Sequence, residues 1–304
     1  MLFYTHDGCL RHEAQRGHPE RPDRLRAVNQ SLSACGLMDR FECRVARPIE
    51  TEGLAAVHDP AYLAQLDAAS PASGLVRLDP DTAMNPDTLC AAALAAGAVT
   101  DAVQAVLDGF DNRAFCAVRP PGHHAEVGAA MGFCYYNSIA LGAAQALKQV
   151  DRVAILDFDV HHGNGTVDAF KDRPDVLVCS SFQHPFYPYR HTDVDAPNIV
   201  NTPLPAGTDG AAFRRAIERG WADAVNAHRP DLILVSAGFD AHRDDRLGGL
   251  LLEDEDFRWI TEFIVDLAEA HAGGRVVSAL EGGYDLAALG RCAVLHAEAL
   301  QSGG

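Results

Sequence analysis

Residues 155–165 end an apolar run in side chains that could bind a metal ion. Their sequence is Ile-Leu-Asp-Phe-Asp-Val-His-His-Gly-Asn-Gly. Alternate side chains of a β-strand share a face, so Asp157, Asp159 and His161 are expected on one side and apolar residues on the other. A carboxylate and an imidazole two residues apart suit zinc or a similar divalent metal. A solvated turn explains the segment less well, because buried carboxylates without a cation are costly.

Polar side chains also follow three other strand-like segments, and these side chains are His123, His124, Asp240 and Tyr284. In an open parallel sheet, ligands bind beyond the carboxyl ends of the strands. Catalytic zinc usually has three protein ligands, so Asp240 is the expected third. The histidine pair could supply a base, oriented by the Asp157 carboxylate. Tyr284 follows two glycines and could donate to a developing oxyanion.

The segments that must position these residues alternate between helix-like and strand-like patterns. Alanine-rich residues 86–107 predict a buried helix. The other expected elements cover residues 22–34, 58–66, 114–118, 137–148, 152–157, 165–171, 176–181, 210–227, 232–236, 254–271, 276–280 and 285–299. Proline-rich residues 69–86 and 182–205 are expected to be loops. The alternation predicts an α/β fold, and the absence of repeats and linkers predicts one domain over residues 1–304.

Composition and charge narrow the classes of function. The 304 residues are 48% hydrophobic, and the net charge of −17 argues against nucleic-acid binding while attracting a basic peptide or amine. The eight cysteines form no Cys-x-x-Cys pair and are expected to be reduced. The N-terminus does not resemble a signal peptide, and no run of 18 apolar residues was found. We expect a cytoplasmic protein that does not span a membrane.

Five motifs, which cover nearly the whole chain, resemble those of the zinc-dependent histone deacetylases. In order, they are Arg119-Pro-Pro-Gly-His-His-Ala-Glu126, Gly132-Phe-Cys-Tyr-Tyr-Asn137, Asp157-Phe-Asp-Val-His-His-Gly-Asn-Gly165, Ser236-Ala-Gly-Phe-Asp-Ala241 and Glu281-Gly-Gly-Tyr284. Asn164, where class I members carry aspartate, resembles the class II branch and its bacterial amidohydrolase and acetylpolyamine aminohydrolase relatives. The resemblance implies the arginase/deacetylase fold, a single open, mostly parallel sheet with helices on both faces.

The resemblance also implies a role for each matching residue. The ligands of one zinc ion per chain would be Asp159, His161 and Asp240. His124 would be the general base and acid, with His123 as its electrostatic partner, and Tyr284 would polarise the acyl carbonyl. The expected reaction is removal of an acetyl or other acyl group from the ε-amine of lysine, or from a similar amine, by metal-activated water.

A narrow substrate channel would be lined by Gly132, Phe133, Tyr187 and Leu247. Phe133 and Tyr187 would be its two walls, although the family usually has phenylalanine at the second position. Polyamine-specific relatives carry a glutamate where this chain has Leu247, so leucine favours acyl-lysine. Asp244 and Asp245 nearby leave acetylated polyamines or other small amides as the alternative.

The family also binds one or two structural potassium ions. The first would be held by the carbonyls of Asp157, Asp159 and His161 and the Ser180 hydroxyl. A second, outer ion would use carbonyls near Phe170, Arg173 and Val176.

An arginase-like ureohydrolase is the remote alternative, because it shares the fold but holds two manganese ions on many carboxylates. Residues 161–164 lack the Asp-x-His-x-Asp pattern, and no aspartate lies two residues after Asp240. An acyl-group reader with an inactive site would lack the base, a ligand or the tyrosine, and this sequence has all of them. The sequence leaves open the physiological substrate, the acyl chain length, the oligomeric state and whether the native metal is zinc or iron.

Overall fold

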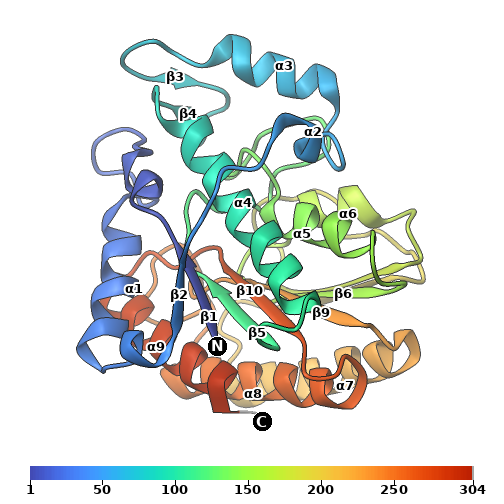
Figure 1. Cartoon of the computed structure of the whole chain (residues 1–304). Helices are drawn as coiled ribbons and strands as arrows, with labels where there is room; N and C mark the ends of the chain where they lie inside the picture. Colours follow the sequence, from blue (N-terminus) through green and yellow to red (C-terminus); the bar gives the residue numbers. More distant parts are fainter. Residues whose placement is uncertain (303–304) are drawn as a thin grey trace.

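The computed structural model describes residues 1–302 and contains one large sheet (Figure 1). In pairing order, its eight strands are β2 (Glu42–Val45), β1 (Leu2–Thr5), β5 (Arg113–Cys116), β10 (Val276–Leu280), β9 (Leu232–Ala237), β6 (Val153–Asp157), β7 (Val176–Gln183) and β8 (Ile199–Leu204). All neighbouring strands in this sheet are parallel. A small antiparallel hairpin pairs β3 (Val76–Arg77) with β4 (Ala83–Met84). The predicted α/β fold with a single open, mostly parallel sheet is confirmed.

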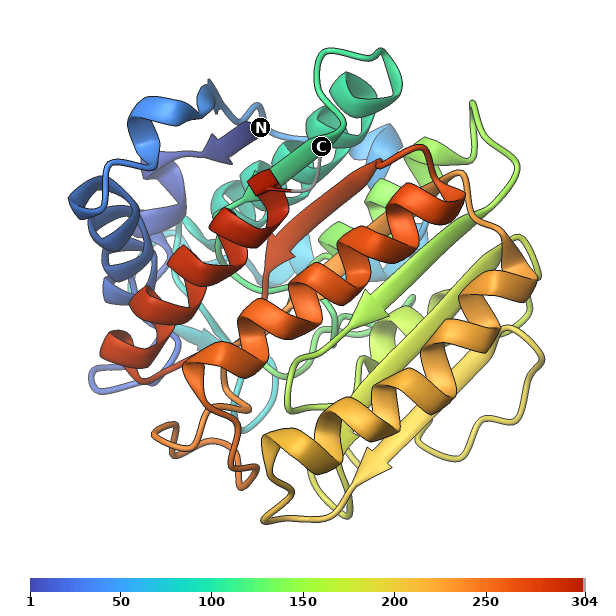
Figure 2. The same ribbon diagram turned by 90° about the horizontal axis from the view of Figure 1, so that it is seen from below.

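Helices cover both faces of the sheet. One layer, seen in front of the sheet in Figure 2, contains α7 (Gly210–His228), α8 (Asp254–His271) and α9 (Leu286–Ser302), and α1 (Asp23–Ala34) packs on α9. The opposite layer contains α4 (Thr88–Leu107), α5 (Ser138–Ala146) and α6 (Asn164–Phe170). The remaining short helices are η1 (Asp7–Arg11), η2 (Met38–Arg40), α2 (Thr51–Leu54) and α3 (Pro60–Ala69). In Figure 1, α2, α3 and the hairpin lie above the carboxyl ends of the strands.

Helix α4 is long and apolar enough to cross a membrane by length and composition alone. However, 67% of its apolar window is buried, and it packs against α5, β1, β5 and β10. Ala95, Ala98 and Ala102 are almost completely buried, so small side chains let the helix lie close to the sheet. We therefore interpret α4 as a core helix.

Strand β6 lies between β9 and β7 near the middle of the large sheet. Val153, Ile155 and Leu156 are fully buried, as expected for a parallel strand covered on both faces. The strand ends at Asp157, earlier than the predicted alternation of ligands requires. Asp159 and His161 lie in the following loop, where Asp157 Oδ1 accepts the Asp159 N–H at 3.1 Å. A folded loop, rather than a pleated strand, gathers the three side chains.

Residues 182–205 are not entirely a loop, because they contain the edge strand β8. β8 pairs with β7 only, so its Pro203 can lack an N–H without breaking a central ladder. The predicted loop at residues 69–86 likewise contains the hairpin of β3 and β4. All eight cysteines are free thiols, as predicted.

Candidate active site

Three ligands of one cation meet at the carboxyl edge of the large sheet. Asp159 and His161 follow β6 and Asp240 follows β9, and one ligand atom of each lies within 4.8 Å of the others. His161 Nδ1 is 3.0 Å from Asp159 Oδ1 and 3.2 Å from Asp240 Oδ2. Asp240 Oδ2 is buried and has no hydrogen-bond partner among residues 1–302. A buried carboxylate oxygen without a donor, beside two further ligands, fits a divalent cation.

The charges of these three residues are strongly coupled. Burial and the Asp159 carboxylate raise the pKa of Asp240 to about 6. Burial opposes ionisation of Asp159 too, but His123 and His161 hold its pKa below the usual range. Burial lowers the pKa of His161, but the hydrogen bond of its ring with Asp159 and the nearby Asp240 carboxylate raise it to about 10. Binding of a metal by these three residues would therefore be coupled to the release of a proton.

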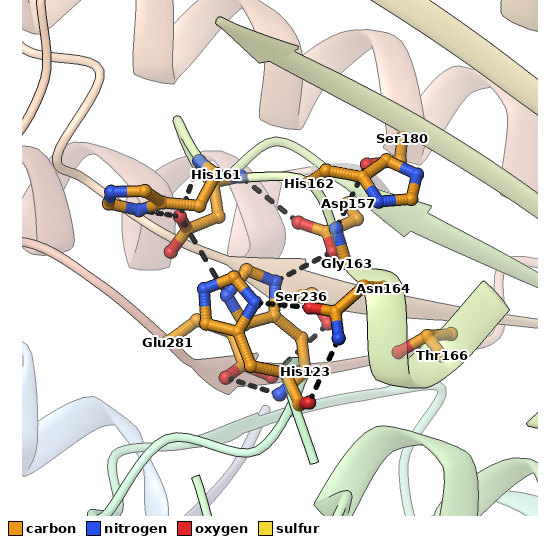
Figure 3. Close-up of polar contacts among 12 residues, drawn as sticks. His123, Asp157, His161, His162, Gly163, Asn164, Thr166, Ser180, Ser236 and Glu281 are labelled. Atoms are coloured by element: carbon orange, nitrogen blue, oxygen red, sulfur yellow. Dashed lines mark hydrogen bonds and ion pairs between the residues drawn. The ribbon is translucent and has the colours of Figure 1, made fainter. Parts of the chain in front are cut away.

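The two histidines after β5 have different partners. His123 Nδ1 lies 2.9 Å from Asp157 Oδ2, and Figure 3 shows the two side chains facing each other. His124 Nδ1 lies 2.7 Å from the Asn164 amide oxygen. Burial opposes a charge on His123, but Asp157 raises its pKa well above the usual range. Burial and the neighbouring His123 and His161 lower the pKa of His124 well below its usual value, so one imidazole is charged and the other neutral.

Glu281, the first residue of the fifth motif, holds the histidine loop in place. Its Oε2 accepts the N–H groups of Gly122 at 2.7 Å and His123 at 3.1 Å, and its Oε1 accepts the Ser236 hydroxyl at 3.2 Å. Figure 3 shows Glu281 beside His123 and Ser236. Burial raises the pKa of Glu281 to about 7 despite the nearby His123. The sequence indicated Tyr284 in this motif but not the role of Glu281. The contacts of Glu281 with the residues after β5 and with Ser236 of β9 form only in the folded chain, so no local sequence pattern predicts them.

Tyr284 lies at the end of the same motif, and Gly282 brings its loop against the ligands. A Cβ at Gly282 would lie 2.1 Å from Asp240 Oδ2, so only glycine fits there. Burial raises the pKa of Tyr284 well above its usual value, so the phenol stays a donor. The Arg24 guanidinium lies 4.7 Å from the centre of the Tyr284 ring. The sequence suggested only a helix start at Arg24, and no local signal distinguished it from a surface arginine.

An open cavity of about 250 Å³ leads to this group of residues. It is lined by Asp81, His124, Gly132, Phe133, His161, Phe186, Tyr187, Arg246, Leu247 and Tyr284. Every residue that the sequence assigned to the channel is in this lining. Phe186 is an addition, and its ring stacks on His161 with centroids 5.4 Å apart, whereas Tyr187 meets His161 edge-on at 6.0 Å. Phe186 could have been considered only as the neighbour of Tyr187.

The two potassium sites suggested by the sequence differ in their fit. At the inner one, within residues 1–302, no N–H or O–H donates to the carbonyls of Asp159 and His161, whereas the Asp157 carbonyl accepts the Ser181 hydroxyl at 3.5 Å. The two carbonyls without a donor fit a monovalent cation. At the outer one, the Asn198 amide nitrogen donates to the carbonyls of Phe170, Arg173 and Val176 at 2.7, 3.0 and 2.9 Å. These carbonyls already have a donor at their centre and do not fit a second ion.

Comparisons with known proteins agree with this geometry. The histone deacetylase domain family model matches residues 18–300. A histone deacetylase-like amidohydrolase of Pseudomonas aeruginosa is 38% identical over 96% of this chain and 79% of its own length. A probable deacetylase of Archaeoglobus fulgidus is 36% identical over 92% of this chain and 80% of its own. The crystal structure of the HDA15 HD domain superposes with a TM-score of 0.93 at 34% identity, covering 98% of this chain and 87% of that domain. The chain therefore belongs to the histone deacetylase family of amide-hydrolysing enzymes.

Proposed function

We propose that this protein is a zinc-dependent deacetylase that hydrolyses the amide of an acetylated or otherwise acylated lysine side chain. One observation carries the proposal. At the base of an aromatic-lined channel, three ligands of one cation lie beside a neutral imidazole and a phenol. This set can hold a Lewis acid, move a proton and stabilise an oxyanion at one point.

Asp159, His161 and Asp240 would hold the ion, which when bound polarises the acyl carbonyl and makes water more acidic. His124 is the general base, because its low pKa keeps it neutral at pH 7. Its Nδ1 faces the Asn164 amide oxygen and therefore carries a hydrogen, which leaves the lone pair on Nε2. The proton that His124 accepts can then be returned to the departing amine.

His123 and Tyr284 act on charge rather than on protons. The charge that His123 gains from its Asp157 partner stabilises negative charge developing next to His124, whose ring centre is 4.1 Å away. The Tyr284 phenol donates to the carbonyl oxygen as that oxygen becomes negative. Asp157 is a positioning residue, because it fixes the His123 ring.

Contacts at the channel mouth favour an apolar-linked amide over a polyamine. Leu247 lines the channel and offers no charge to a distal ammonium. Asp245 Oδ1 accepts the Leu247 N–H at 2.9 Å, and its Oδ2 accepts the N–H of Asp285 at 3.0 Å. The Asp244 carboxylate lies 3.6 Å from the Arg291 guanidinium. Asp244 and Asp245, the two acidic residues that could attract a polyamine, thus already have partners within the protein.

A single potassium ion binds at the inner carbonyls, with Ser180. The protein acts in the cytoplasm on an acylated amine, without a nucleic acid or a membrane as partner. The net charge of −17 supports the absence of a nucleic-acid partner, because it repels phosphate backbones, and it attracts cationic substrates.

The test is turnover of acetyl-lysine peptides and of acetylated polyamines by the purified enzyme, with and without a chelator. We expect peptide turnover that the chelator abolishes and zinc restores. Asp240→Ala should remove both the metal and the activity, and the exposed Asp244→Ala is the matched control that should keep both. Elemental analysis should give one divalent ion per chain. Two ions per chain would contradict the proposal and support the arginase-like alternative.

A further inference from the structure

The orientation of the Asn164 side chain decides which nitrogen of His124 is the base. Asn164 Oδ1 faces His124 Nδ1 at 2.7 Å. If the amide turned over, its NH₂ group would face Nδ1, and Nδ1 would have to become the acceptor. The hydrogen would then move to Nε2, and the base would lose its lone pair. An asparagine alone does not prevent this, because its two ends have nearly the same shape.

Glu126 supplies the missing constraint. Its Oε1 accepts a hydrogen bond from Asn164 Nδ2 at 2.8 Å, and the Glu126 side chain is 6% exposed. An ionised carboxylate only accepts hydrogen bonds, so it attracts the NH₂ end of the amide and repels the oxygen. The other contacts of Asn164 Nδ2 are weaker, the His124 carbonyl at 3.3 Å and the Met131 sulfur at 3.2 Å.

Glu126 also contacts the segment between β7 and β8. Its Oε2 lies 2.8 Å from the Arg190 guanidinium, and its Oε1 lies 3.4 Å from His191 Nε2. Glu126, Asp168 and His191 also have the spacing of metal ligands. We do not interpret them as a metal site, because the Arg190 cation already pairs with Glu126 and Lys171 lies 2.6 Å from Asp168.

We propose that Glu126 is a positioning residue for the reaction proposed above, because it holds the Asn164 amide with its oxygen toward His124. The inference rests on that proposed function only in taking His124 as the base. It also explains why this chain has an amide at position 164. An aspartate there would place two carboxylates 2.8 Å apart, where like charges repel.

The contact between Glu126 and Asn164 can be tested by exchanging the carboxylate and the amide between the two positions. Glu126→Gln should lower kcat about tenfold with KM nearly unchanged, because the Asn164 amide loses its fixed orientation. Asn164→Asp should lower kcat about 100-fold, because its carboxylate faces Glu126. In the double variant, the introduced amide at position 126 donates to the introduced carboxylate at position 164, which in turn accepts the His124 Nδ1–H. The kcat of the double variant should therefore return to within about fivefold of wild type.

Arg190→Gln is the matched control, because it removes the surface partner of Glu126 but leaves the contact with Asn164. Its kcat should stay within about twofold of wild type. Metal content and melting temperature of every variant show that it is folded and loaded. Losses that simply multiply in the double variant would overturn the proposal, and so would a Glu126→Gln effect confined to KM.

A second readout does not depend on activity. The ¹⁵N spectrum of histidine-labelled protein distinguishes an imidazole N–H from a bare nitrogen, and His124→Gln assigns the signal. We expect one tautomer with Nδ1–H in wild type and in the double variant, and a mixture in Glu126→Gln. The same single tautomer in Glu126→Gln would overturn the inference. An inactive wild type with the expected tautomers would instead contradict only the proposed function.

Discussion

The Tyr284 phenol and the His124 imidazole line one cavity, but they are proposed to act on different atoms of the substrate. Tyr284→Phe removes a donor to the carbonyl oxygen and should lower kcat about 10²–10³-fold on acetyl-lysine. A trifluoroacetyl substrate needs less help because its carbonyl is more electrophilic. The loss should therefore be partly rescued when kcat/KM is measured on that substrate. Full activity of Tyr284→Phe on acetyl-lysine would show that the phenol has only a structural role.

His124→Ala provides the contrast. Loss of a proton-transfer group should lower kcat about 10²–10⁴-fold. Departure of the amine still requires a proton, so the trifluoroacetyl substrate should rescue this variant less than Tyr284→Phe. Equal rescue of both variants in the same assay would contradict the separation of their roles.

At the scale of elements, His58 connects the start of α3 to the start of α5. Its Nδ1 donates to the Glu126 carbonyl at 3.0 Å, and its Nε2 accepts the Asn137 N–H at 2.9 Å. The Asn137 side chain in turn caps α5 by accepting the Ala140 N–H at 3.0 Å. Burial lowers the pKa of His58 to about 4, because a proton on Nε2 would remain desolvated and break the bond from Asn137. The folded protein therefore keeps His58 neutral.

This makes stability depend on pH in a defined direction. The unfolded chain binds a proton at His58 below about pH 6.5, whereas the folded chain does so only near pH 4. The contribution of neutral His58 to the free energy of unfolding is thus fully present above pH 6.5. It falls as the pH decreases through this window, by about 2 kcal/mol between pH 7 and pH 5. Urea unfolding of wild type and His58→Gln at both values measures it. The stability difference between the two proteins should shrink at pH 5, and a constant difference would contradict the assignment.

The Asn198 side chain joins the start of β8 to the turn between α6 and β7. Asn198→Asp would replace the donor among the three carbonyls by a carboxylate, and four oxygens then require a cation. We expect the melting temperature of Asn198→Asp to rise with potassium more steeply than that of wild type, in which only the inner site responds. Asn198→Ala should lower stability by about 2 kcal/mol. Identical potassium dependence of wild type and Asn198→Asp would contradict our interpretation of the outer site.

Several elements could be predicted from sequence because their side chains report burial directly, although the short buried strand β1 was missed. β6 and β9 each begin with four consecutive apolar residues, and α8 has a strong helical period that starts at an acidic first turn. β2 was missed because it is exposed and carries Glu42 and Arg44, so it has no apolar pattern. The ligands could be found because they directly follow predicted strands. Arg24 and Phe186 could not, since only the tertiary fold brings Arg24 to the Tyr284 ring and Phe186 to the cavity.

At the scale of the whole molecule, a buried ionic cluster connects the N-terminal segment to the sheet. Arg119, which follows β5, donates to both oxygens of Glu20 at 2.7 and 2.6 Å. Arg24 lies 3.2 Å from the same carboxylate and donates to the Gly283 carbonyl at 2.6 Å. Burial opposes a charge on Glu20, but Arg119 and His12 hold its pKa well below the usual range. The Glu20 carboxylate therefore offsets the charge of two arginines, Arg24 and Arg119, that lie far apart in sequence.

Glu20→Gln should lower the free energy of unfolding by about 3–5 kcal/mol, because it leaves two guanidinium groups buried without a counter-charge. Asp23→Asn is the control, since Asp23 pairs with Arg26 at 2.8 Å on the exposed face of α1. Its effect should be below about 1 kcal/mol. Chemical denaturation compares the two, and similar losses would show that the Glu20 cluster is no more important than a surface pair.

Both ends of the described chain lie near the amino ends of the strands, toward the bottom of Figure 1, whereas the channel residues follow the carboxyl ends. The Met1 ammonium is 2.8 Å from the Asp111 carboxylate, and Arg113 donates to the Leu300 carbonyl at 2.8 Å. An affinity handle or fluorophore at either end would therefore point away from the substrate entrance. Molecules immobilised through such a handle should all present the channel to solution. A sensor chip built in this way could capture acylated peptides without the support blocking access.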